Sequence, residues 1–129
     1  MYEDEIEALS EILYGYVSRR KPDAPEDARK GAARFVAAVL VLAASWGAGD
    51  ALAGHLLRKA GRRAAERLHA ILSALGVRGL PKPGEPDVYC WKVMESADFG
   101  DEEVNEAVRE LRRMGLSGGS YRPSFLARR

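Results

Sequence analysis

The sequence predicts an all-α fold: a single-domain bundle of about five helices with a central buried helix. Three observations lead to this class. Apolar residues recur at three- and four-residue spacing through most of the chain, as they do on one face of a helix. One long stretch is apolar all the way round, which is typical of a helix enclosed by others. Clusters of Pro and Gly separate these segments, and a chain of this length forms one core, so residues 1–129 are expected to form a single helical domain.

The first helix is predicted in the segment DEIEALSEILYGYV, where Ile6, Leu9 and Leu13 share one face. Its acidic residues crowd the first turns, where the helix dipole favours negative charge. The following segment, SRRKPDAPED, contains two prolines and several turn residues, which predicts a loop. The next helix is expected to begin near Pro25, with Asp23 or a neighbour as its cap.

The central helix is predicted from Glu26 to about Trp46, because no polar side chain occurs between Phe35 and Ala44. A membrane-spanning helix is the alternative interpretation. A span of sufficient length would have to include Asp50 and several glycines, which hydrocarbon disfavours. We therefore expect a core helix and no membrane partner.

A long amphipathic helix is predicted next, from its cap Asp50 to Leu75, with Gly76 as its stop. The glycines of the preceding segment SWGAGD predict a break or kink before it. Its core stripe is expected to consist of Leu52, Leu56, Ala60, Ala64, Leu68, Ile71, Leu72 and Leu75.

The rest of the chain contains one more strong helical signal. The segment GVRGLPKPGEPD has three prolines and three glycines and predicts a loop. The segment VYCWKV, residues 88–93, forms at most a short strand or else a helical turn, because periodicity does not decide between them. The segment GDEEVNEAVRELRRMG predicts a helix capped by Asp101 and stopped by Gly115. Residues 115–129 are expected to form a basic tail that is flexible or bound to a partner.

Charge is strongly segregated along the chain although the net charge is only +1. Residues 1–17 carry −5, residues 18–79 carry +7, residues 80–114 carry −4 and residues 115–129 carry +3, which sum to +1. The densest positive stretch, residues 55–69, has five Lys or Arg and a single Glu. Blocks of opposite sign create a directional field, which bears on the choice of partners.

This basic stretch is the candidate site, because a ridge of Lys and Arg on a helix can follow a nucleic-acid backbone and release its counterions. The residues predicted to contact phosphates are Arg58, Lys59, Arg62, Arg63 and Arg67, followed by a second group, Arg29, Lys30 and Arg34. The second group lies in the first turns of a helix, where the dipole disfavours positive charge. The competing interpretation is a solvated face whose charges pair with the acidic segments 1–17 or 101–110.

Six aromatic side chains offer surfaces on which bases of a single strand could stack: Tyr14, Tyr16, Trp46, Tyr89, Trp91 and Tyr121. Most of them are expected to fill the core or to anchor loops. This applies above all to Trp46, because it directly follows the apolar run.

The sequence has no pattern that predicts catalysis, a metal or another cofactor. His55 and His69 are fourteen residues apart and Cys90 is the single cysteine, so no metal-ligand spacing exists. No phosphate-cradling glycine loop and no local nucleophile signature occurs, and the paired acids at 102–103 belong to a helix start. We expect a non-enzymatic cytoplasmic protein, since one cysteine and an acidic N-terminus indicate no secretion. The absence of Thr and Gln, with fifteen Arg against five Lys, is typical of hyperthermophile proteins.

The segment WGAGDALAGHLLRKAG resembles the small helical subunit of type III-B (Cmr-type) CRISPR effector complexes. The residues that carry the resemblance are Gly47, Asp50, Ala51, Leu52, Ala53, Leu56, Leu57, Lys59 and Gly61, together with the closing segment EEVNEAVRELRRMG. The chain lacks the proline of that family's hydrophobic helix and the Asn before its glycine turn. The resemblance implies a non-catalytic subunit that stacks along an antiviral complex and lines the guide–target duplex with basic side chains.

Two further resemblances remain open. Size, helix content and charge blocks are similar to those of the coat proteins of filamentous archaeal viruses, which wrap DNA with basic helices, and this would place the protein in a virion. The closing helix with its glycine-containing basic tail also resembles the recognition half of a winged helix. The sequence thus predicts a subunit that assembles with copies of itself or other subunits along a nucleic-acid backbone, DNA or RNA. A protein–protein adaptor that binds no nucleic acid is the alternative.

Overall fold

The computed structural model describes residues 2–128, and over this range the protein is all-helical, as the sequence predicts. These described residues form six α-helices and a short 3₁₀ helix without any β-strand, and their one β-type pairing is an isolated bridge between Arg78 and Asp98. The elements are α1 (Glu3–Arg20), α2 (Glu26–Gly47), α3 (Ala51–Ala60), α4 (Arg62–Ala74), α5 (Pro86–Ser96), α6 (Glu102–Leu116) and η1 (Ser124–Arg128).

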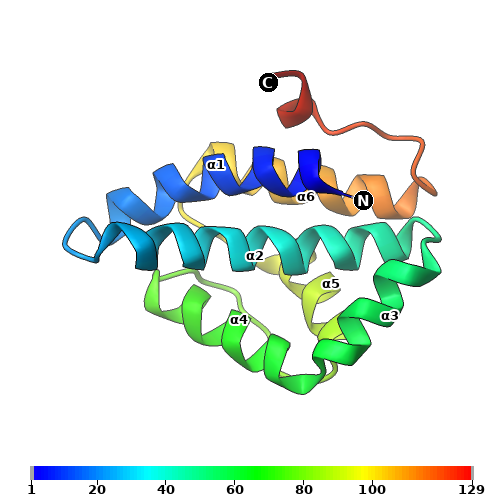
Figure 1. Cartoon of the computed structure of the whole chain (residues 1–129), viewed down its shortest axis with the longest axis horizontal. Helices are drawn as coiled ribbons and strands as arrows, with labels where there is room; N and C mark the ends of the chain where they lie inside the picture. The colour runs from blue at the N-terminus through cyan, green and yellow to red at the C-terminus, as the bar shows by residue number, and fades with distance from the viewer. Residues whose placement is uncertain (1, 129) are drawn as a thin grey trace.

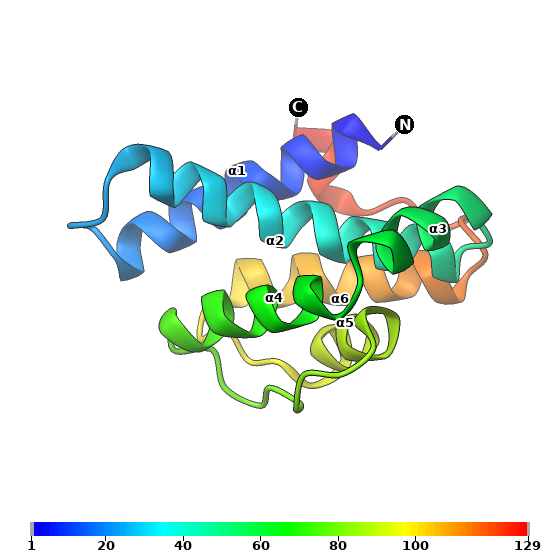
Figure 2. The same ribbon diagram turned by 60° about the horizontal axis from the view of Figure 1, so that its bottom comes forward.

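Helix α2 is the centre of the fold, because it contacts every other α-helix. Helix α1 runs along one side of α2, α3 and α4 lie on the opposite side, and α5 and α6 cover a third (Figures 1 and 2). Its small and branched residues allow this close approach, and those fully enclosed include Ala33, Val36, Ala37, Leu40, Val41, Ala43 and Ala44. By length and composition α2 could cross a membrane, but half of its most apolar stretch is buried in the fold. This burial supports the prediction of a core helix.

The prediction of one long helix over residues 50–75 is wrong, because this segment forms two helices, α3 and α4, separated at Gly61. Gly61 has φ +69°, in the left-handed region that favours glycine, and serves as the end of one helix and the start of the next. The two helices meet at a sharp corner on the side of α2 opposite α1 (Figure 1). A straight helix of 26 residues would leave the surface of α2, whereas two shorter ones both pack against it.

The break also changes which face of α3 is buried. Leu52 and Leu56, placed in the core by the sequence pattern, are 46% and 45% exposed. The face that meets α2 instead contains Ala53, Gly54 and Leu57, one position along the helix. In α4 the prediction is better, since Ala64, Leu68 and Leu72 are buried as expected, with Leu75 just beyond the helix, whereas Ile71 is half-buried.

Two predicted helix caps are confirmed. The Asp50 carboxylate accepts hydrogen bonds from the backbone N–H groups of Leu52 and Ala53, at 2.9 and 3.2 Å, and it also accepts one from the Tyr2 hydroxyl at 2.6 Å. Asp101 caps α6 by accepting from the N–H of Val104 at 3.1 Å.

The segment 88–93 is helical, inside α5, with Pro86 in its first turn. Gly115 does not stop the last helix, because α6 continues to Leu116 and the backbone reaches the left-handed region only at Gly118 and Gly119. The ring of Trp91 and the Ala44 carbonyl lie so close to Gly115 that a side chain would not fit there. This glycine therefore serves packing and not helix termination.

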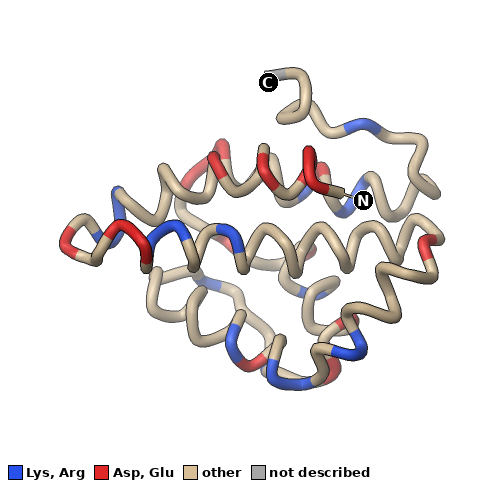
Figure 3. Tube along the Cα trace, viewed as in Figure 1, with Lys and Arg blue, Asp and Glu red and all other residues tan. Residues whose placement is uncertain are grey.

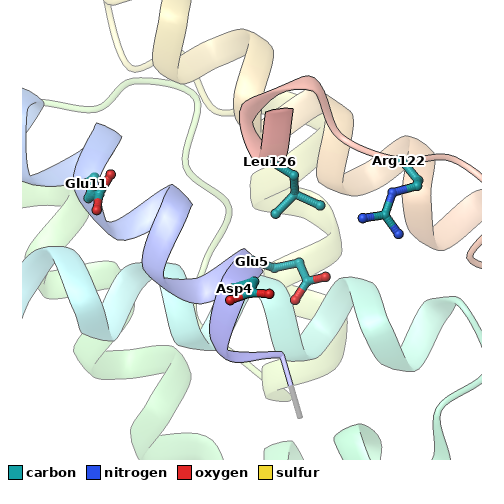
Figure 4. Close-up of a pocket in the computed structure, with 5 residues that line it drawn as sticks. All are labelled: Asp4, Glu5, Glu11, Arg122 and Leu126. Carbon is teal, nitrogen blue, oxygen red and sulfur yellow. The ribbon is translucent and has the colours of Figure 1, made fainter. Parts of the chain in front are cut away.

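The C-terminal tail folds back over α1 and α6 (Figure 1). Phe125 is buried in the core, and the nearly buried Glu110 carboxylate accepts hydrogen bonds from the Ser124 N–H and hydroxyl and from the Tyr121 hydroxyl, at 3.0 to 3.1 Å. Arg122 and Leu126 of the tail face Asp4 and Glu5 of α1 across a cavity of about 530 Å³ (Figure 4). The tail thus has a defined place on its own chain.

Glu110→Ala is expected to release this tail. It removes the acceptor of three hydrogen bonds to a charged group, which should cost about 1–2 kcal/mol and expose the peptide bonds after Tyr121 and Phe125. Chymotrypsin should then cut the tail several times faster than in the parent protein. Glu102→Ala, which removes an exposed carboxylate from the same helix, is the control and should leave the cleavage rate unchanged. Equal rates in both variants would contradict the role given to Glu110.

Candidate nucleic-acid interface

Five predicted site residues lie within two helical turns of the point where α3 ends and α4 begins. We call this surface the basic corner; it consists of Arg58, Lys59, Arg62, Arg63 and Arg67, all exposed. The break at Gly61 creates it, since it places the basic last turn of α3 against the basic first turns of α4. Figure 3 shows Lys and Arg gathered along this edge of the molecule, with Glu66 the one acid of α3 and α4.

Only one member of the basic corner pairs with a carboxylate in the described part of the chain. Arg62 lies 3.4 Å from Glu85, and both side chains are 67% exposed, so the pair contributes little. No carboxylate lies within ion-pair distance of Lys59 or Arg63 over residues 2–128. Most of the positive charge of this surface is therefore not neutralised internally.

The two remaining arginines stack on aromatic rings. The Arg58 guanidinium lies 4.4 Å from the centre of the Trp46 ring, and that of Arg67 lies 4.2 Å from the centre of the Phe35 ring. Stacking uses the face of a guanidinium and leaves the N–H groups in its plane free to donate to an anion. It also restricts these side chains before any ligand arrives, which lowers the entropy lost on binding.

The acidic segments 1–17 and 101–110 do not neutralise the basic corner within one chain. Among the described elements, neither α1 nor α6 contacts α3 or α4. The acids of α6 engage other arginines: Asp101 pairs with Arg19 at 2.7 Å, and Glu102 pairs with Arg109 at 2.7 Å. The acidic first turns of α1 lie on the far side of α2 from the corner (Figure 3).

The second predicted group does not join the basic corner. Lys30 pairs with Glu26 at 2.9 Å, which raises the pKa of this lysine. Arg29 donates to the Ser18 hydroxyl and the Ala24 carbonyl, at 2.9 and 3.0 Å. Arg34 and Lys30 line a cavity shared with acids of α1. Arg29 thus joins α2 to α1, Lys30 pairs within α2, and Arg34 lies beside the acids of α1, with Lys30 and Arg34 exposed.

Beside the basic corner lies an apolar depression of about 480 Å³ that the sequence did not reveal. It is lined by Trp46, Gly47, Asp87, Val88, Trp91, Lys92 and Glu95. The expectation that Trp46 is a core residue holds only in part, since it is half-buried and borders this depression. Val88, which is part of this lining on α5, is 49% exposed. Other aromatics are structural as expected: Tyr16 and Tyr89 are buried, and the Tyr16 hydroxyl donates to the Phe99 carbonyl at 2.6 Å.

Groups with other chemistry are used internally. Burial raises the pKa of the Cys90 thiol to about 12, so it is protonated at neutral pH and is a poor nucleophile there. His69 shares a hydrogen bond of 2.8 Å with the hydroxyl of Tyr89. Within residues 2–128, no group of three or more His, Cys, Asp and Glu side chains is arranged to hold a metal ion.

Comparison of the chain with known protein families, with curated proteins and with solved structures finds no match.

Proposed function

We propose that this protein is a non-catalytic helical subunit that binds nucleic-acid backbone through the basic corner and assembles into a multi-subunit nucleoprotein complex. The observation that carries the proposal is a cluster of five exposed cations with a single, loose carboxylate contact within residues 2–128. Such a cluster costs repulsion between its members, which an external polyanion relieves. Contact with phosphates gives affinity without base sequence preference.

The distribution of charge also supports assembly. The acidic start of α1 and the basic corner lie on opposite sides of α2 (Figure 3), an arrangement that favours head-to-tail contact between copies. Stacked copies would place their basic corners in a row along one strand or duplex. Both a subunit similar to the small subunit of Cmr-type CRISPR complexes and, as the alternative, a filamentous-virus coat protein would use such a row. The adaptor alternative places the acidic face of another protein on the same corner.

Charge reversal at two positions tests the proposal. Arg62→Glu with Arg63→Glu should weaken binding of a labelled oligonucleotide by about thirtyfold at low salt, because two phosphate contacts are lost and repulsion is added. The matched control is Lys21→Glu with Lys82→Glu, which changes the net charge equally at exposed positions outside the corner and should weaken binding only slightly. Fluorescence anisotropy measures both.

Two outcomes would contradict the proposal. Equal losses in the two double variants would mean that net charge and not the corner determines affinity. Loss of self-association with unchanged nucleic-acid affinity would favour the adaptor.

A further inference from the structure

The two tryptophans of the chain, Trp46 and Trp91, border the same apolar depression. They come from different helices, α2 and α5, and both are only half-buried. Single half-buried tryptophans are common, but both indoles of this chain line one concave apolar surface, and such a surface can hold a ligand.

Three glycines lie directly against these indole rings. A Cβ at Gly54 would lie 2.5 Å from ring atoms of Trp46, and one at Gly115 would lie 2.7 Å from Trp91. A Cβ at Gly47 would clash with the same Trp91 ring. Because the glycines let backbone lie directly against the rings, each indole is held in a fixed orientation with part of its surface facing outward.

The depression is continuous with the basic corner through one side chain. Arg58, a member of the corner, stacks on the ring of Trp46, which is part of the lining. An extended polyanion bound at Arg58 would therefore have its next chemical group within reach of the two indoles.

The charges of the lining are not those of a phosphate site. The lining contains two carboxylates, Asp87 and Glu95, and one ammonium group, that of Lys92. Glu95 also pairs with Arg112 at 3.0 Å. Carboxylates repel phosphate but accept hydrogen bonds from the amino groups of nucleobases. An apolar surface with indole rings and carboxylate acceptors beside a cationic rim fits a planar base whose own phosphate lies outside, on the corner.

We propose that this depression receives an unpaired nucleobase, so that the preferred partner is a single strand whose phosphates lie along the basic corner. This inference rests on the proposed function, which supplies the phosphate contacts. A duplex keeps its bases stacked and paired, and it offers only backbone to the corner.

The tryptophans themselves report on the test, because both line the depression and their emission can be excited selectively over that of the five tyrosines. Three ligands are titrated: a 12-residue oligoadenylate as DNA and as RNA, an abasic oligonucleotide with as many phosphates, and a 12-base-pair duplex. We expect the oligoadenylate to quench the emission strongly, and the abasic strand and the duplex to bind with little quenching. The oligoadenylate should bind about tenfold more tightly than the abasic strand, as stacking of a base predicts.

A matched pair of variants locates the effect. Val88→Glu replaces an exposed apolar side chain of the lining by a longer charged one, which removes surface on which a base could lie. Leu52→Glu makes a similar change at a similarly exposed residue outside the lining. Both positions are on helix surfaces, so both variants should fold. The first should abolish the tenfold preference for the oligoadenylate over the abasic strand, and the second should retain it.

The possible failures are distinguishable. Equal affinity and equal quenching with abasic and base-containing strands would overturn the nucleobase site and leave the proposed backbone binding intact. Failure of all three ligands to bind would overturn both. Emission that changes with protein concentration and not with oligonucleotide would mean that a second copy of the chain covers the depression, which also overturns the inference.

Discussion

Replacing Leu57 with Ala is expected to lower the free energy of unfolding by about 3–4 kcal/mol, the usual cost of an emptied leucine site in a rigid core. Leu57 is 1% exposed and is the largest buried side chain of α3. It holds the last turn of α3 on the core, directly before the corner at Gly61. Its loss should therefore loosen the arrangement of Arg58 and Lys59 as well as the fold, and urea denaturation measures the cost.

Leu52→Ala is the control, because Leu52 lies on the same helix and undergoes the same change. At 46% exposure its truncation should cost less than about 1 kcal/mol. The pair also decides which face of α3 is buried, since the sequence pattern places Leu52 in the core and the structure places Leu57 there. A larger loss at Leu52 than at Leu57 would contradict the packing described above.

Gly54→Ala is expected to destabilise the protein by about 2–3 kcal/mol, although alanine is the better helix former. The added methyl would lie 2.5 Å from Trp46, so either the indole or α3 must move. Either movement separates Arg58 from the ring on which it stacks. We therefore also expect a change in tryptophan emission, which thermal denaturation followed by fluorescence detects together with the lower stability.

Gly31→Ala is the control substitution, and it should raise the stability of the protein where Gly54→Ala lowers it. Nothing lies within 4 Å of a Cβ at Gly31, which is inside α2, so the substitution should stabilise the protein by about 0.5–1 kcal/mol. Stabilisation by both substitutions would show that Gly54 is not needed for the close approach of α3 to Trp46.

The features that sequence predicts well here are local. The central helix follows from the unbroken apolar run, and the caps Asp50 and Asp101 follow from residue types with a short-range hydrogen-bonding role. The five residues of the basic corner could also be identified, because exposure on α3 and α4 follows from their charge. Their gathering into one surface was predicted only in outline.

The features that sequence missed depend on contacts between elements. A single glycine inside a helical pattern costs only about 1 kcal/mol, so the break at Gly61 is decided by packing on α2 and not by local preference. Arg58 and Trp46, which stack on each other, belong to different helices. The depression and its two indole rings are likewise formed by helices distant in sequence. One signal was present: Gly54 lies inside a predicted helix where no turn requires a glycine, whereas Gly47 and Gly115 lie at helix ends, where the sequence predicts a break and a stop.

The salt dependence of affinity for a single-stranded 12-mer tests the central claim most directly, since the claim is that the cations of the basic corner displace counterions from phosphates. If about four of its five cations do so, the logarithm of the association constant should fall linearly with the logarithm of salt concentration, with a slope of about −3. In the double variant Arg62→Glu with Arg63→Glu, the slope should be less negative by about one to two. An affinity that does not change with salt, or no binding at about 50 mM salt, would contradict the account.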